Sequence, residues 1–144
     1  MKLVEQERAE GNAPTGIIAK GVFDSDHKIG FDIIDLATDN IIPLARIDWQ
    51  IPDGFQAGKY IFSRDTFDSA CRALLNYHQG GVVFLDEVGP LELSGGGYAD
   101  CLRRLLDSDI NKLYVIVRES CVSELIEKFL LNHDYEIKLL NELT

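Results

Sequence analysis

The 144-residue sequence has few basic residues and no long apolar run. It contains 14 Lys and Arg against 24 Asp and Glu, which gives a net charge of -10 at pH 7. This excess of negative charge repels phosphate backbones, so we expect no nucleic-acid partner. No stretch is long and apolar enough to span a membrane, and residues 1–7 are too charged for a signal peptide, so we expect no membrane association.

Cysteine and histidine are also scarce, with three of each. Cys71, Cys101 and Cys121 are widely spaced and odd in number, so we expect reduced thiols in the core and a cytoplasmic location. The sequence contains no Cys-x-x-Cys and no His-x-x-x-His spacing, so we expect no structural zinc site.

The length fits one domain over residues 1–144. Apolar periodicity and turn residues predict helices over 1–10, 63–77, 98–106 and 120–131, and strands over 16–23, 28–36, 41–47, 60–62, 82–85, 113–117 and 135–139. Residues 48–59 are predicted to be mostly loop. Helices alternate with strands in the second half, which predicts an α/β fold with a mostly parallel sheet and an added antiparallel hairpin.

One short apolar strand ends in two adjacent carboxylates, in the run Val82-Val83-Phe84-Leu85-Asp86-Glu87. Ligands of parallel sheets bind beyond the carboxyl ends of the strands. In nucleotide hydrolases this arrangement is the Walker B segment, in which the Asp holds Mg²⁺ and the Glu activates the attacking water. The same string also occurs where solvated acids simply end a strand, and the string by itself does not decide between the two.

The sequence has no Gly-x-x-x-x-Gly-Lys-Ser/Thr phosphate-binding loop. Residues 11–16 have the glycine spacing, but Ile17 and Ile18 stand where Lys and a hydroxyl residue are required. Residues 54–60 are one residue short and lack the hydroxyl. We therefore interpret both segments as ordinary loops.

Two longer segments carry a family resemblance. Residues 86–93, Asp-Glu-Val-Gly-Pro-Leu-Glu-Leu, are similar to the signature Asp-Glu-hydrophobic-Gly-Lys-Met-Glu-Leu of the thermophile-type nucleoside triphosphatases, a family with a cancer-related vertebrate branch. Residues 28–36, Lys-Ile-Gly-Phe-Asp-Ile-Ile-Asp-Leu, resemble the family's Arg-Ile-Gly-Phe-Asp-Ile-Val-Asp-Leu hairpin. Pro-Leu-Ala-Arg at 43–46 and Gly-Lys-Tyr at 58–60 also match, so the resemblance spans nearly the whole chain.

The resemblance implies a P-loop-NTPase-like three-layer fold and Mg²⁺-dependent hydrolysis of a nucleoside triphosphate such as ATP or GTP. Asp86 would hold Mg²⁺ through water, and Glu87 would be the general base. Arg118 follows the predicted strand 113–117 and would reach the same sheet edge, where it contacts phosphate or forms a surface salt bridge. Glu92 matches a family acid but also suits a helix start, and Lys20 lies at a strand end as a further nucleotide-binding candidate.

The chain also departs from the family pattern. Pro90 and Leu91 replace the signature's Lys-Met, and the family's opening strand and phosphate loop are missing. Residues 1–11 resemble the back half of the helix that follows that loop, so our hypothesis is that the chain begins inside this helix, through a misassigned start or a lost front end. Without the loop we expect little or no hydrolysis by this chain.

Two alternatives stay open at this point. The chain could be a non-catalytic interaction domain that forms a homodimer through surface left uncovered by the missing strand. Trp49, Phe55 and Tyr60 flank the loop after the hairpin, where they stack a base or, as we favour, pack under the loop.

Overall fold

The computed structural model describes residues 1–77 and 81–140, which form one seven-stranded sheet flanked by helices. The sheet order is β4-β5-β3-β2-β1-β6-β7. The strands are β1 (Thr15–Asp24), β2 (His27–Asp35), β3 (Ile41–Arg46), β4 (Gly54–Ala57), β5 (Tyr60–Ser63), β6 (Val82–Val88) and β7 (Lys112–Val117). The helices are α1 (Lys2–Ala9), α2 (Arg64–Leu75), α3 (Pro90–Leu93), α4 (Ala99–Leu106) and α5 (Val122–Leu125), with α5 preceded by the 3-10 turn Glu119–Cys121 and continued by the π-helical turn Ile126–Leu130.

The predicted α/β class with a parallel core and an antiparallel hairpin is confirmed. β1, β6 and β7 pair in parallel, whereas β2, β3, β5 and β4 extend the sheet in antiparallel pairings. The antiparallel part is larger than the single hairpin we expected, because the predicted loop 48–59 contains β4. Phe55 of this strand pairs with Phe62 of β5. β4 begins at the turn-forming Gly54 and lies between Pro52 and Gly58, so the amino-acid composition of this segment predicts a loop and not a strand.

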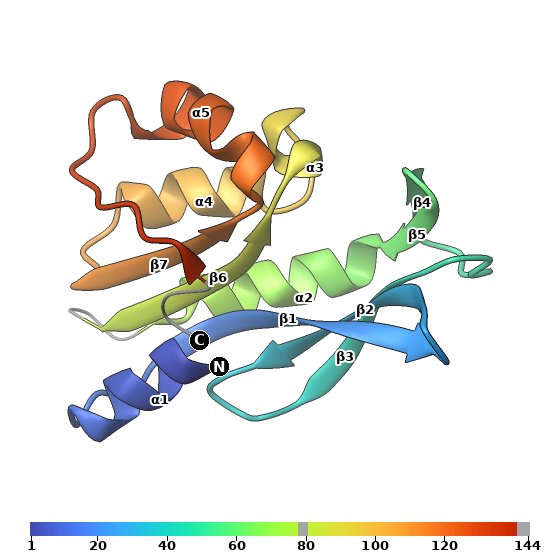
Figure 1. Cartoon of the computed structure of the whole chain (residues 1–144), viewed down its shortest axis with the longest axis horizontal. Helices are drawn as coiled ribbons and strands as arrows, with labels where there is room; N and C mark the ends of the chain where they lie inside the picture. Colours follow the sequence, from blue (N-terminus) through green and yellow to red (C-terminus); the bar gives the residue numbers. More distant parts are fainter. Residues whose placement is uncertain (78–80, 141–144) are drawn as a thin grey trace.

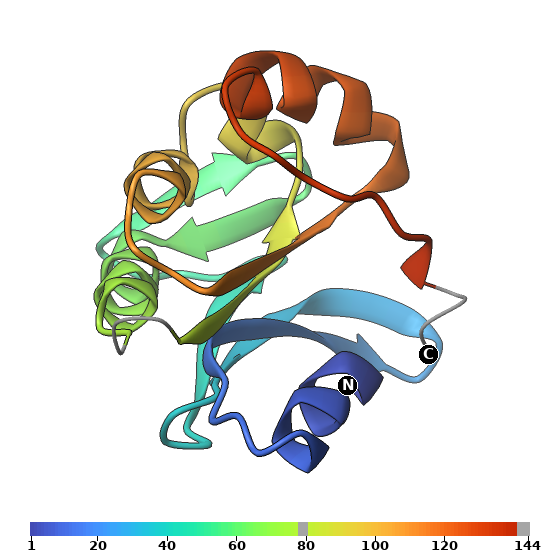
Figure 2. The ribbon, with the colours of Figure 1, turned by 90° about the vertical axis from the view of Figure 1, so that its left-hand side faces the viewer.

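Helices cover both faces of the sheet, which gives three layers (Figures 1 and 2). The side chains of β6 alternate between the two faces, as a strand requires. Val82 and Phe84 pack under α1 with Leu3 and Val4. The next positions along the strand, Val83 and Leu85, join the larger core that α2, α4 and α5 cover; its helical members include Phe67, Ala70, Leu74, Ala99, Leu102, Leu105 and Leu125.

β1 lies unusually close to β6. Gly16 pairs with Phe84, and a Cβ atom at Gly16 would collide with the Phe84 backbone carbonyl oxygen. The φ of +110° at this position also suits glycine alone. This close pairing fixes the register of β1 and brings the backbone of Ala19 next to the carboxyl end of β6.

The face under α1 is held by a buried carboxylate. Glu7 is 2% exposed and accepts hydrogen bonds from the Tyr114 hydroxyl (2.6 Å), the Asn12 amide (2.7 Å) and the Lys112 ammonium (2.9 Å). Together these contacts, led by the Tyr114 hydrogen bond, lower the pKa of Glu7 even though burial opposes them. The helix is thereby fastened to β7 by side chains from two distant parts of the chain.

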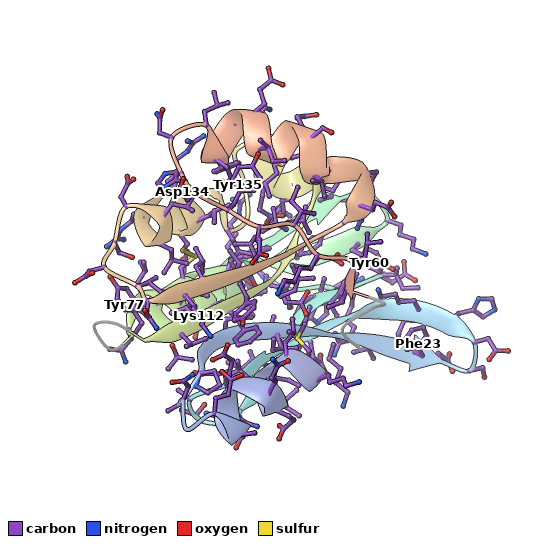
Figure 3. The ribbon with its side chains drawn as sticks, turned by 60° about the vertical axis from the view of Figure 1, so that its left-hand side comes forward. Phe23, Tyr60, Tyr77, Lys112, Asp134 and Tyr135 are labelled. Carbon is purple, nitrogen blue, oxygen red and sulfur yellow. A yellow bond between two sulfur atoms is a disulfide. The ribbon has the colours of Figure 1, made fainter. Side chains whose placement is uncertain are left out.

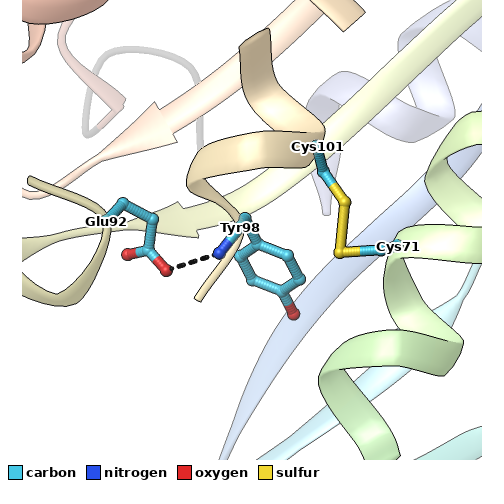
Figure 4. Close-up of a disulfide and its surroundings, with 4 residues drawn as sticks. All are labelled: Cys71, Glu92, Tyr98 and Cys101. Atoms are coloured by element: carbon cyan, nitrogen blue, oxygen red, sulfur yellow. Dashed lines mark hydrogen bonds between the residues drawn. A yellow bond between two sulfur atoms is a disulfide. The ribbon is translucent and has the colours of Figure 1, made fainter. Parts of the chain in front are cut away.

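The prediction of three reduced thiols is wrong for two of them. Cys71 of α2 and Cys101 of α4 form a disulfide across 30 residues, and Cys121 is free and buried (Figure 4). Spacing could not reveal this pair, because α2 and α4 meet only in the folded chain. The disulfide removes the cysteine-based reason for a cytoplasmic location, which stays a prediction. None of the described helices has the length and apolar character needed to cross a membrane.

The predicted strand over 135–139 is also wrong, because these residues form no regular element. Tyr135, Ile137 and Leu139 alternate as in a strand, yet each is at least half exposed and packs against no second strand. An alternating pattern is compatible with a strand, but a strand also needs a neighbouring strand to hydrogen-bond with its backbone. Figure 3 shows Tyr135 on the irregular C-terminal segment, well away from Phe23 at the tip of the β1–β2 hairpin.

Candidate active site

Asp86 and Glu87 end β6 and both line one pocket of about 420 Å³. Successive strand residues normally face opposite ways. Here the pairing of β6 with β7 shifts register between Asp86 and Val88, so the alternation is interrupted where the two acids stand. They are joined by a cis peptide bond. The pocket lies between the carboxyl end of β6, the antiparallel part of the sheet, α3 and the start of α4.

Asp86 is a partly buried carboxylate that accepts one hydrogen bond from the described residues. Its Oδ2 accepts from the Ala19 backbone N–H at 3.2 Å. Burial raises the pKa of Asp86 to about 6, helped by the neighbouring charge of Glu87 and opposed by the Ala19 hydrogen bond and by Lys28. A carboxylate at this depth is poorly compensated by the protein, which is the state expected of a group that meets a cation or a ligand.

Glu87 and Arg118 lie close together in the lining of the pocket. The Arg118 guanidinium is 3.6 Å from the Glu87 carboxylate, and both side chains are well exposed, at 54% and 39%. An ion pair of this exposure adds little stability. Arg118 is therefore free to exchange its carboxylate partner for an anionic ligand. The prediction that it reaches the same edge as Asp86 agrees with its place in the pocket lining.

Glu92 fixes the loop that follows the acids. Its carboxylate is buried and accepts from the backbone N–H groups of Gly89 (2.9 Å) and Tyr98 (3.1 Å). Burial raises the pKa of Glu92, and these two hydrogen bonds oppose the shift. A Cβ atom at Gly97 would collide with the Glu92 carboxylate, so glycine is needed there. Glu92 lines the pocket, but both of its oxygens are already occupied by the backbone.

The predicted site residues separate into two groups. Asp86, Glu87, Glu92 and Arg118 all line the pocket, whereas Lys20 is exposed on β1 and is not part of the lining. Sequence reasoning missed Tyr98, which also lines the pocket. Tyr98 follows a glycine run and belongs to no recognisable motif, so no signal in the sequence marks it.

The donor chemistry of the pocket fits Mg²⁺. Asp86 and Glu87 offer carboxylate oxygens, the ligands that this hard cation prefers. Within residues 1–77 and 81–140 no group of three or more His, Cys, Asp or Glu side chains is arranged to hold a metal. Mg²⁺ usually takes one or two protein carboxylates and completes its shell with waters and substrate phosphates, and Asp86 and Glu87 would supply that number.

Comparison with known proteins identifies relatives along nearly the whole chain. A family profile described as NTPase matches residues 1–142. A nucleoside-triphosphatase THEP1 from Methanopyrus kandleri is 30% identical over 112 residues, which cover 77% of this chain and 61% of that protein. A nucleoside-triphosphatase THEP1 from Thermotoga maritima is 27% identical over 129 residues, covering 88% of this chain and 71% of that protein. The chain thus spans less than two thirds of the Methanopyrus relative.

Two solved structures share the fold. The solution structure of a human cancer-related nucleoside triphosphatase superposes with a TM-score of 0.70 at 20% identity, over 99% of this chain and 82% of that one. The crystal structure of THEP1 from the hyperthermophile Aquifex aeolicus gives a TM-score of 0.64 at 17% identity, over 90% of this chain and 77% of that one. At these identities the likeness concerns the fold.

Proposed function

We propose that this chain, which belongs to the NTPase family, carries the water-activating part of a site for Mg²⁺-dependent hydrolysis of a nucleoside triphosphate to the diphosphate and phosphate. The observation that carries this proposal is the convergence of Asp86, Glu87 and Arg118 on one pocket at the carboxyl end of a parallel strand. The names of the relatives support the substrate class.

Each side chain has a role that its surroundings favour. Asp86 holds Mg²⁺ through water, and the bound ion supplies positive charge to the triphosphate. Glu87 lines the pocket beside Asp86 and takes the proton of the attacking water. Arg118, now 3.6 Å from Glu87, turns to a phosphate oxygen when the nucleotide binds. Glu92 and Lys20 stay predictions as nucleotide contacts, because Glu92 already serves the backbone and Lys20 lies outside the pocket.

Hydrolysis by these 144 residues should be slow, because their sequence contains no phosphate-binding loop. Such a loop provides backbone donors, a Lys charge and a hydroxyl ligand for the metal. Electrostatic positioning supplies most of the catalysis in phosphoryl transfer, and the loss of one such donor lowers the rate about 10²–10³-fold.

The proposal is tested by phosphate release from ATP and GTP with and without Mg²⁺. We expect slow, Mg²⁺-dependent release by the unchanged protein and a further loss of about 10²-fold or more in Glu87→Gln, which removes the base. Glu127→Gln is the matched control, since Glu127 is an exposed acid outside the pocket. Release that survives in Glu87→Gln would show that Glu87 is not the base.

A second candidate function is self-association through β7. This strand ends the sheet, and its outer edge pairs with no strand in the described part of the chain. Its five apolar residues, Leu113, Tyr114, Val115, Ile116 and Val117, are all partly exposed, although natural edge strands are usually shielded by charge. Sedimentation should then show dimers that Val115→Lys disrupts and that the hairpin-tip variant Phe23→Lys leaves intact; a monomeric unchanged protein would rule this out.

A further inference from the structure

The Tyr98 hydroxyl is a buried donor without an acceptor. Tyr98 is 2% exposed, and its hydroxyl is the one buried side-chain polar atom in the described residues that forms no hydrogen bond. Its backbone N–H is used by Glu92, and Figure 4 shows the hydroxyl pointing away from that carboxylate. Buried polar groups in folded proteins nearly always have partners, so an orphan next to a cavity indicates that something else fills the position.

The cavity beside Tyr98 has the size and lining of a small-molecule site. It measures about 420 Å³, within the range in which drug-sized ligands are bound. Most of its lining surface is apolar, and charged and hydroxyl side chains make up the smaller part. Pockets of this character orient a largely apolar ligand by a small number of placed hydrogen bonds.

One side of the pocket is a continuous aromatic wall, made of Phe31, Tyr60, Phe62, Phe67 and Tyr98. Neighbouring rings are in contact along its whole length. The centroid distances are 5.1 Å for Phe31–Tyr60, 6.4 Å for Tyr60–Phe62, 5.7 Å for Phe62–Phe67 and 5.0 Å for Phe67–Tyr98. Such a wall favours a flat, unsaturated ligand, because rings and bases stack well on aromatic side chains.

The charged side chains around the pocket give further information on the chemical class of ligand that it can bind. Asp86 and Glu87 line it together with Lys59 and Arg118, so the charges in the lining partly offset one another and do not by themselves call for a charged ligand. Among the described residues, the Tyr98 hydroxyl is the buried lining group that is left without a hydrogen-bond partner. A ligand that suits both the aromatic side chains and this donor is a planar ring that bears a hydrogen-bond acceptor.

We infer that this pocket binds a nucleobase, stacked along the aromatic wall with a ring nitrogen or exocyclic oxygen accepting from the Tyr98 hydroxyl. The choice of a nucleobase among planar rings rests on the proposed function. The base belongs either to the triphosphate that is hydrolysed or to a separate nucleoside beside it. In both cases Tyr98 is a binding residue whose contact is independent of Mg²⁺ and of Glu87.

The test is calorimetric titration of the unchanged protein and Tyr98→Phe with adenosine, guanosine, cytidine and uridine in the absence of Mg²⁺. We expect at least one nucleoside to bind the unchanged protein and to bind Tyr98→Phe about 5- to 10-fold more weakly, as the loss of one hydrogen bond predicts. The same substitution should raise the melting temperature of the ligand-free protein, because it removes an unpaired buried hydroxyl.

Tyr114→Phe is the matched control. It removes a hydroxyl that donates to Glu7 on the other face of the sheet, so it should lower the melting temperature and leave nucleoside affinity unchanged. Competition between a nucleoside and a nucleoside triphosphate then shows whether the base in the pocket belongs to the triphosphate or to a separate molecule. A triphosphate that displaces the nucleoside carries its own base into the pocket, and simultaneous binding assigns the pocket to a second molecule.

Two outcomes would overturn the inference: no nucleoside binding at millimolar concentration, or equal affinity in the unchanged protein and Tyr98→Phe. Neither depends on phosphate release. A failure of the proposed hydrolysis would therefore leave the nucleoside titration readable, and a failure of the titration would leave the roles of Asp86 and Glu87 untouched.

Discussion

Two regions of the molecule, the face under α1 and the pocket, differ in how completely their buried polar groups are hydrogen-bonded. Under α1, Glu7 accepts three side-chain hydrogen bonds, and the Tyr114 hydroxyl is one of the donors. At the pocket, Asp86 accepts one backbone hydrogen bond and the Tyr98 hydroxyl makes none with any residue in 1–77 or 81–140. The pKa shifts follow this contrast, since that of Glu7 is lowered and that of Asp86 is raised.

This contrast indicates that Glu7 stabilises the fold, whereas Asp86 is available to bind a ligand or a cation. The core under α1 is small, with Leu3, Val4, Val82 and Phe84 as its buried members, so its polar contacts must contribute to stability. The opposite face has the larger core and a disulfide, and it can tolerate polar groups that lack partners. Poorly compensated groups beside a cavity are typical of functional sites.

Among the substitutions that test this contrast, the largest effect is expected on the rate of nucleotide hydrolysis when Asp86 is replaced. Asp86→Asn removes the charge that would hold Mg²⁺, so Mg²⁺-dependent phosphate release should fall about 10²–10³-fold. The melting temperature should not fall, because burial already disfavours the ionised side chain. Phosphate release and thermal unfolding measured on the same preparation check both statements. A variant that unfolds at lower temperature and keeps its rate would assign Asp86 to the fold instead.

The second prediction concerns the disulfide on the pocket face of the sheet. It asks whether this covalent link supplies the stability with which that face offsets its incompletely hydrogen-bonded polar groups. Opening the 30-residue connection between Cys71 and Cys101 should lower the free energy of unfolding by roughly 3 kcal/mol, because the unfolded chain regains conformational freedom. Urea unfolding with and without reductant measures this. A double Cys71→Ser/Cys101→Ser variant should not respond to reductant, and a response there would point to Cys121.

Removing the carboxylate under α1 should lower stability and leave the rate of hydrolysis unchanged, which is the opposite of the result expected for Asp86→Asn. Glu7→Gln weakens three hydrogen bonds at a site that is 2% exposed and should lower the free energy of unfolding by about 2 kcal/mol. Since Glu7 lies on the far face from the pocket, the rate of phosphate release should not change. Chemical denaturation and the release assay decide this, and a fall in rate without a loss of stability would couple α1 to the site.

The smallest expected effect is a pH dependence that belongs to Glu7. Its pKa is lowered on folding, so its contribution to stability is present above the ordinary Glu pKa near 4.5 and is lost as pH falls through the folded value. The stability difference between the unchanged protein and Glu7→Gln should therefore shrink from pH 7 to about pH 3.5. Urea titrations at both pH values measure it, and a difference that grows on acidification would reverse the assigned sign.

Much of the fold and of the acidic end of the site was accessible from the sequence. The apolar run of β6, the two acids that follow it and the apolar run of β7 are local patterns, and they predicted the parallel strands that the structure shows. Asp86, Glu87 and Arg118 all line one pocket at this edge, and their roles stay predictions. The serine cap of α2 was equally local, since Ser63 accepts from the Thr66 N–H at 3.1 Å.

What the sequence could not reveal depends on contacts between distant segments. The pairing of Cys71 with Cys101 requires α2 to lie beside α4, and the anchoring of Glu7 requires Lys112 and Tyr114 to lie under α1. The orphan hydroxyl of Tyr98 is likewise defined by what surrounds it. The four residues of β4 form a strand only because β5 supplies a partner.

The central claim is that Asp86 holds a divalent cation at the carboxyl end of β6, and paramagnetic broadening tests it most directly. Mn²⁺ replaces Mg²⁺ in such oxygen sites and broadens nearby NMR signals. With Mn²⁺ and ATP present, we predict selective broadening of the backbone amides of Ala19 and Gly89, and its loss in Asp86→Asn. Broadening that is spread over the exposed acids, or that persists in Asp86→Asn, would contradict the account.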